Sequence, residues 1–211
     1  MFKFTPSFYQ SSDGNDAWDV NLRANHGPHA GWIGFYRDHQ DAQQARGGYE
    51  YTQGLSSGQV VWSAQVAGGG FLGGSITGQF GDAVYLIAGF GRTDRHDYFN
   101  LNFDPNDAIT LGLGGHLDDA NDVSLYHIWD DRLGTRQHVT HLYLHHTGAG
   151  GQRFSVDGSW KSGLNSAGDY VRGLSVTGTY ALGAWFLRIA HDRYANFGTA
   201  DQNRISIGRS F

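Results

Sequence analysis

The amino-acid sequence predicts an all-β fold, a closed antiparallel transmembrane β-barrel that uses residues 1–211 as a single domain. Three observations predict it. Apolar and polar residues alternate with a period of two along almost every segment, the polar faces are poor in Lys, and aromatic residues gather toward the ends of the apolar faces. Barrels of this kind have an even number of strands, so we expect about twelve, with about fourteen as the alternative.

Strand alternation is clearest over residues 17–25, AWDVNLRAN. The apolar face carries Trp18, Val20, Leu22 and Ala24, and the polar face carries Asp19, Asn21, Arg23 and Asn25. Successive side chains of a strand point to opposite faces, so this segment separates an apolar from a polar surface. The same pattern predicts strands at residues 60–66, 84–90, 99–103, 109–113, 154–160, 174–180, 185–189 and 205–211.

Clusters of Gly, Asn and Asp separate these segments and predict turns, and no segment has a helical period. DPND at 104–107 and ALGA at 181–184 both look like tight turns. The polar segment DHQDAQQARGG at 38–48 is either an exposed loop or folds into the interior.

The polar faces distinguish a membrane barrel from a soluble β-sandwich, which is the alternative fold. The outer faces of a sandwich meet bulk water and tend to carry Lys and Glu. The polar faces of this chain are instead rich in Ser, Thr, Asn, Gln, Gly and Tyr, and the whole chain has only 15 Lys and Arg residues. This composition favours a wet interior crowded by facing side chains.

Aromatic residues toward the strand ends predict girdles at two membrane interfaces. They are Trp18, Trp62, Phe90, Trp129, Trp160, Tyr180 and Trp185. Lipid forbids unpaired backbone groups and open sheet edges, so a membrane-spanning sheet has to close into a barrel.

Composition excludes several other classes of protein. There is no Cys, which excludes a disulfide scaffold and any thiolate site. The net charge is -5, with both signs spread along the chain, so no basic stripe predicts nucleic-acid binding. The glycines lie between strands and no helix follows them, so no phosphate-binding loop or other cofactor site is predicted.

The C-terminal segment RISIGRSF provides a second indication of a membrane barrel. Ile205, Ile207 and the terminal Phe211, with Arg209 interrupting the pattern, resemble the assembly signal of bacterial outer-membrane proteins. In overall plan the chain resembles small outer-membrane channels such as the oligosaccharide-specific porins, although no family-specific motif is matched. The resemblance implies location in the outer membrane of a Gram-negative bacterium and diffusion of small hydrophilic solutes. It also implies contact with membrane lipid and lipopolysaccharide, and recognition by the assembly machinery through Phe211.

Four of the 11 histidines fall within HVTHLYLHH, residues 138–146. On a strand, Leu142 and Leu144 would face lipid, and His141, Tyr143 and His145 would point into the lumen. His141 and His145 would then lie roughly 13 Å apart, at about 3.3 Å per residue, which is too far for one metal ion. A metal site would need ligands from neighbouring strands, such as His116, His127, Asp130 or Asp157, and we predict none.

Charged and polar residues on the inward faces form the predicted solute-binding site. They are Asp19, Arg23, His141, Tyr143, His145, Arg188, Asp192 and Arg204. Glu50, Asp157 and Lys161 are also expected to point inward. Opposed charges across a lumen orient polar solutes and set ion preference. The alternative is that these charges pair with one another and fill a narrow interior.

Two other functions stay open. Lipid-modifying barrel enzymes, the deacylases and a phospholipase, resemble one another in a His-x-Ser-Asn pattern. This chain has His145, His146, Thr147 and Gly148 instead, so no catalytic residue is predicted, although an outward His127 or His146 would be the candidate. The other alternative is a structural barrel with a plugged lumen.

Overall fold

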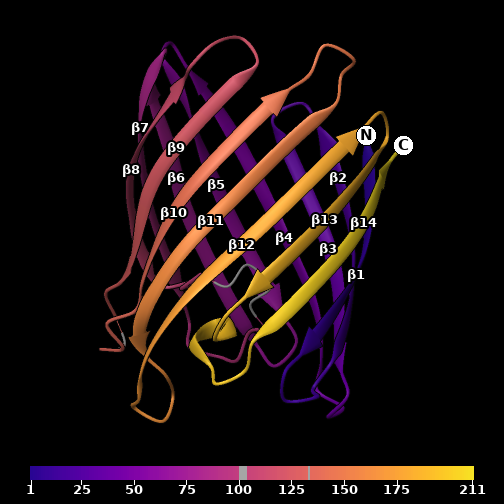
Figure 1. The fold of residues 1–211 in the computed structure, drawn as a ribbon, viewed down its shortest axis with the longest axis vertical. Helices are drawn as coiled ribbons and strands as arrows, with labels where there is room; N and C mark the ends of the chain where they lie inside the picture. Colours follow the sequence, from indigo (N-terminus) through magenta and orange to yellow (C-terminus); the bar gives the residue numbers. More distant parts are fainter. Residues whose placement is uncertain (100–103, 133) are drawn as a thin grey trace.

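A computed structural model describes residues 1–99, 104–132 and 134–211, and within them the chain forms one closed barrel of fourteen antiparallel strands (Figure 1). The predicted all-β closed barrel is confirmed, and the strand number is the alternative, fourteen, rather than twelve. Each strand pairs with its neighbours in sequence, and β1 closes the barrel onto β14 through pairs such as Ser7 with Ser206.

The strands follow one another along the chain, and the longest connection joins β7 to β8. Their bounds are β1 Phe2–Ser11, β2 Ala17–His26, β3 His29–Asp38, β4 Gln43–Leu55, β5 Gly58–Ala67, β6 Phe71–Gly81, β7 Val84–Thr93, β8 Ala108–His116, β9 Asn121–Asp130, β10 His138–Thr147, β11 Arg153–Leu164, β12 Tyr170–Leu182, β13 Trp185–Asp192 and β14 Gln202–Ser210. Composition left two interpretations of the segment 38–48, an exposed loop or a segment folded into the interior. In the structure it contains the end of β3, the turn to β4 and the start of β4.

The two ends of the barrel differ in their connections. The N- and C-termini lie together at one end, here called the terminal end, where connections such as 27–28, 56–57 and 183–184 are short (Figure 1). ALGA is therefore a tight turn, as predicted. The longer connections, of which the structure describes residues 94–99, 104–107, 131–132, 134–137 and 193–201, lie at the opposite end, here called the far end.

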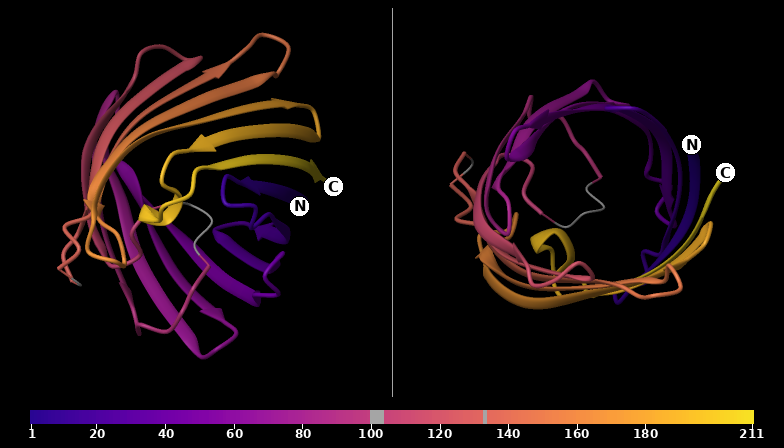
Figure 2. Two further views of the ribbon diagram at one scale, coloured as in Figure 1. Left: turned by 60° about the horizontal axis from the view of Figure 1, so that its bottom comes forward. Right: turned by 90° about the horizontal axis from the view of Figure 1, so that it is seen from above.

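Two of the long connections enter the barrel. Seen from above, the described parts of the 94–107 connection, residues 94–99 and 104–107, and the 3-10 turn η1 (Ala195–Phe197) lie inside the ring of strands (Figure 2). DPND belongs to the first of these connections and is not a tight turn between strands, contrary to prediction. The strand predicted at 99–103 is also wrong at Phe99, which lies in the connection, and residues 100–103 lie outside the described part of the chain.

The outer surface is apolar. Large hydrophobic side chains alternate with inward polar ones, and Trp18, Ile33, Leu113, Trp160 and Ile189 are each more than half exposed. Of the seven aromatic residues predicted to form girdles, Trp62 and Trp160 are exceptions because they lie inside β5 and β11, away from the strand ends. No helix among the described residues has the length and hydropathy needed to cross a bilayer.

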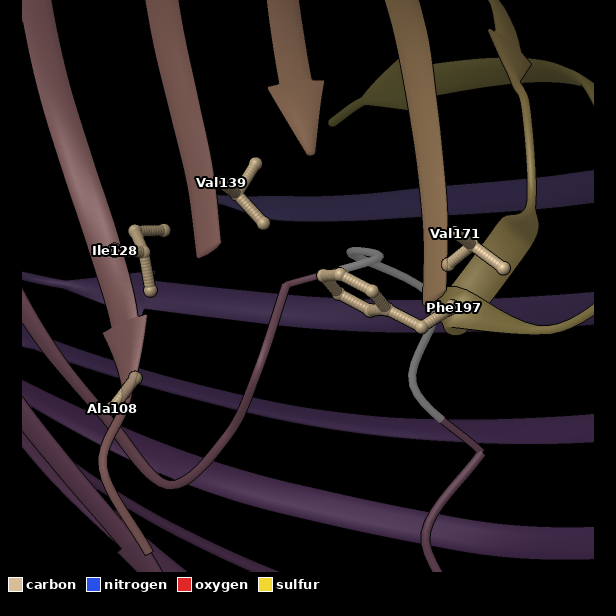
Figure 3. Packing of buried hydrophobic residues seen from close by; sticks show 5 residues of the cluster. All are labelled: Ala108, Ile128, Val139, Val171 and Phe197. Carbon is tan, nitrogen blue, oxygen red and sulfur yellow. The ribbon is translucent and has the colours of Figure 1, made fainter. Parts of the chain in front are cut away.

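Most of the buried apolar side chains in the described structure form two clusters near the entering connections. The larger cluster consists of Ala108, Ile128, Val139, Val171 and Phe197. Figure 3 shows the Phe197 ring, brought in by η1, among the inward side chains of the wall. This cluster fixes η1 against the inner surface at the far end.

Two inward aromatic rings pack directly over glycines of the neighbouring strand. Phe186 pairs across strands with Gly208, and Trp32 pairs with Gly48. A Cβ atom on Gly208 would lie 1.8 Å from a ring carbon of Phe186, and one on Gly48 would lie 2.5 Å from the Trp32 indole. Each ring therefore lies flat across the neighbouring strand, a contact that only glycine allows.

Candidate functional site

The barrel encloses a polar cavity of about 520 Å³, here called the central cavity. Strand residues form its walls, and Tyr98, Pro105 and Asn106 of the inward connection also line it. Its charged lining residues among the described part of the chain are Lys3, Asp19, Arg23, Arg46, Glu50, Arg92, Arg188 and Arg204. Serine, threonine, asparagine and glutamine side chains make up about half of the rest.

A second cavity of about 230 Å³, here called the terminal cavity, lies beside the turn at 183–184. Its polar lining residues are Lys3, Tyr143, His145, Arg153, Ser155, Thr179, Arg188 and Ser210. Lys3, Phe186 and Arg188 line both cavities, so the two spaces meet at these three side chains. Together they run along the inside of the barrel from the terminal end to the inward connection.

Both carboxylates on the described wall of the central cavity are paired with arginine. Arg23 forms a fork with Glu50, at 3.0 Å from Nη1 and 2.5 Å from Nη2. Arg46 pairs with Asp19, and both side chains are less than a tenth exposed. A buried ion pair gains little net stability, but losing one partner is costly, so the pair of Arg46 and Asp19 fixes the wall.

The 94–107 connection is fastened to the wall beside these pairs. Arg46 Nη1 donates to the Phe99 carbonyl at 3.1 Å, and the Gln44 side chain bonds the carbonyl of Asp97 and the amide of Phe99. The Phe99 ring stacks on Tyr36 with centroids 4.8 Å apart. The described parts of the connection are thus held by both polar and aromatic contacts.

The end of this connection is held by Asp107. Its carboxylate accepts hydrogen bonds from the amide and hydroxyl of Thr93, at 2.8 and 2.7 Å, and pairs with Arg132. Burial alone would raise the pKa of Asp107, but the hydrogen bonds from Thr93 and Arg132 outweigh it and hold that pKa below its usual range.

His141 points inward, as predicted, but it does not line either cavity. Its Nε2 lies 3.0 Å from Asp104 in the connection and its Nδ1 lies 3.0 Å from Asp157 in the wall. The Tyr126 ring stacks on the imidazole at 4.6 Å. His141 is therefore a bridge between wall and connection. Within the described ranges, no three His, Asp or Glu side chains are grouped so that they could hold a metal ion.

Asp192 also points inward without lining a cavity. It accepts hydrogen bonds from Lys161, at 2.5 Å, and from Ser175, and the Lys161 ammonium lies 5.6 Å from the Phe197 ring centroid. Both partners of the ion pair are almost completely buried. The ion pair thus contacts η1 through the Phe197 ring.

The outward histidines have partners other than serine. His127 Nδ1 lies 2.7 Å from the Thr140 hydroxyl, and His146 Nδ1 lies 2.8 Å from the Asn121 side-chain oxygen. A threonine hydroxyl and an amide oxygen thus stand beside these histidines, where the His-x-Ser-Asn pattern has a serine.

All of the sequence-predicted site residues lie on inward faces. They do not form one site, because some line the central cavity, others line the terminal cavity, and His141 and Asp192 line neither. Asp19, Arg23, Arg188 and Arg204 line the central cavity, whereas Tyr143, His145 and Arg188 line the terminal cavity. Sequence reasoning missed Lys3, Arg46, Arg92 and Arg153. Lys3 stands between Phe2 and Phe4, so the same alternation rule could have found it.

Comparisons with known proteins find the fold but no family. No family model and no curated protein sequence matches this chain. Among solved structures, the KdgM porin has 7% identity and a TM-score of 0.54, with 99% of each chain covered. The Acinetobacter baumannii outer membrane protein Omp33 has 9% identity and a TM-score of 0.63, covering 100% of this chain and 97% of that one. A mutant porin of Rh. blastica has 9% identity and a TM-score of 0.53, covering 100% of this chain and 99% of that one. The predicted porin-like barrel architecture is confirmed.

Proposed function

We propose that this protein is a channel in a bacterial outer membrane through which small hydrophilic solutes diffuse. The observation that carries the proposal is a closed barrel with an apolar exterior and a charged, polar cavity inside it. Water would disfavour so large an exposed apolar surface, whereas lipid would cover it. Closure pairs every strand on both sides, as a bilayer requires.

The ends of the chain support the proposed location. Phe211 exchanges backbone hydrogen bonds with Phe2, at 2.8 and 2.9 Å, and their rings stack 6.0 Å apart. Phe211 nevertheless stays 66% exposed at the terminal end. We expect its ring to be accessible to the outer-membrane assembly machinery, and the apolar belt to contact membrane lipid and lipopolysaccharide.

The proposed solute path follows the two cavities. Asp19, Arg23, Arg188 and Arg204 would meet the solute in the central cavity, and Tyr143 and His145 would meet it in the terminal cavity. His141 and Asp192 would instead support the entering connections. A structurally similar protein, the KdgM porin, has been solved in complex with disordered oligogalacturonate, which supports a hydrophilic solute for a barrel of this shape.

A liposome-swelling assay tests the proposal. Protein refolded in detergent and inserted into lipid vesicles should admit small sugars and amino acids, with rates that fall as solute size increases. Migration on an unboiled gel verifies that the inserted protein is folded. Folded protein that leaves the vesicles impermeable to every solute would contradict the channel and favour a plugged structural barrel.

A further inference from the structure

We infer that the terminal cavity binds small anions, so that the channel admits anions in preference to cations. The inference rests on the proposed function and names its class of solute. Three basic side chains, Lys3, Arg153 and Arg188, line this cavity, and no Asp or Glu does among the described residues. The histidine His145 is the only other titratable nitrogen described in its lining.

The basic residues of the terminal cavity have no acidic partner among the described residues, unlike Arg23, Arg46 and Arg92 in the central cavity. In the central cavity, Asp19 and Glu50 are each matched by an arginine. By contrast, none of Lys3, Arg153 and Arg188 forms an ion pair in the described structure. Lys3 and Arg188 are also partly buried, and a partly buried charge without a counter-ion is unfavourable unless a ligand supplies one.

The side chains around Phe186 hold two of these cations in place without neutralising them. The Lys3 ammonium lies 4.3 Å from the Phe186 ring centroid, and the Arg188 guanidinium lies 5.7 Å from it. Arg188 Nε also donates to the Thr179 hydroxyl at 3.1 Å. An aromatic face and a hydroxyl orient a cation but leave its charge intact, so both cations keep their full attraction for an anion.

The position of this cation pair makes it relevant to transport. Lys3, Phe186 and Arg188 are the side chains at which the two cavities meet. A solute that moves from one cavity to the other therefore passes both positive charges. Hydroxyls of Tyr143, Ser155 and Ser210 line the same space and can donate hydrogen bonds to carboxylate or phosphate oxygens.

Overall composition does not account for this local charge. The whole chain has a net charge of -5, yet the terminal cavity has only basic charges in its described lining. The three cations come from β1, β11 and β13 and lie together on one part of the inner wall, although the molecule as a whole is negatively charged. Charge lining a narrow passage sets which ions enter it.

The test is the reversal potential of single channels in a planar bilayer under a KCl gradient. The wild type should be anion-selective. The double variant Lys3→Gln/Arg188→Gln should lower the chloride-to-potassium permeability ratio by roughly fivefold, because two nearby positive charges are lost from a confined space. The control Arg37→Gln/Arg172→Gln removes the same charge from exposed far-end positions outside both cavities and should leave the ratio unchanged.

Citrate binding to the detergent-folded protein, measured by calorimetry, gives a second readout that does not require conduction. Wild type and control should bind citrate, and Lys3→Gln/Arg188→Gln should bind it at least about fivefold more weakly. Inorganic phosphate as a competitor separates general anion binding from carboxylate binding. A channel that conducts but shows no anion preference and no citrate binding would overturn the inference and leave the proposed function standing. Absence of conductance together with citrate binding would overturn the proposed function alone.

Discussion

At the scale of single residues, the charged side chains inside the barrel have two different roles. Paired charges such as Asp19 with Arg46 and Lys161 with Asp192 are buried and fix the wall and the entering connections. Charges without an acidic partner, such as Lys3 and Arg188, face open space. The first group should govern stability and the second should govern selectivity.

The buried pair of Asp19 and Arg46 gives a stability prediction. Asp19→Asn should lower the free energy of unfolding by about 3 kcal/mol, because it leaves a buried guanidinium without its counter-ion. The double variant Asp19→Asn/Arg46→Met should recover part of that loss. Urea unfolding in lipid vesicles, followed by tryptophan fluorescence, measures both. Equal losses in the single and double variants would show that the pair is not the source of the effect.

Asp107 gives a prediction of pH dependence. Because its pKa in the folded protein is lowered, Asp107 stabilises the fold above its ordinary pKa of 3.8, and this contribution is lost as the pH falls through the folded pKa. Wild type should therefore exceed Asp107→Asn in unfolding free energy at neutral pH, and the difference should shrink between about pH 5 and pH 2. A difference that stays constant across this range would contradict the assignment.

At the scale of strands, the alternation of side chains predicts most of what the structure shows. Residues such as Arg23 and Arg188 could be placed on the inward face because that face follows directly from a period of two. The strand number was harder to predict. In β4, polar and glycine residues blur the alternation, and the polar segment 38–48 could be interpreted either as an exposed loop or as a segment folded into the interior. Register decides that Arg46 meets Asp19, 27 positions away, and composition does not encode register.

The pairing of glycine with an aromatic ring gives a prediction for one strand pair. Gly208→Ala should displace the Phe186 ring and destabilise the barrel by about 1–3 kcal/mol, because the new methyl group overlaps the ring. It should also change single-channel conductance, since Phe186 lines both cavities. Gly158→Ala is the control, because its Cβ atom would meet nothing within 4 Å. Similar effects from both substitutions would argue against the ring contact.

At the scale of the whole molecule, closure was predictable and the filling of the lumen was not. An apolar outer face and a polar inner face require a barrel, whichever strand number the chain adopts. The entry of the 94–107 connection depends on contacts such as Phe99 with Tyr36 and Asp104 with His141. These residues lie far apart in sequence, and their meeting follows from the curvature of the closed sheet rather than from a local pattern.

The central claim is that this closed barrel conducts. The most direct test is single-channel recording of the folded protein in a planar bilayer, with a boiled sample as control. Discrete, reproducible conductance steps that disappear on boiling are predicted. Folded protein that inserts into the bilayer and gives no conductance steps would contradict the claim, because the entering connections would then close the path that the two cavities outline.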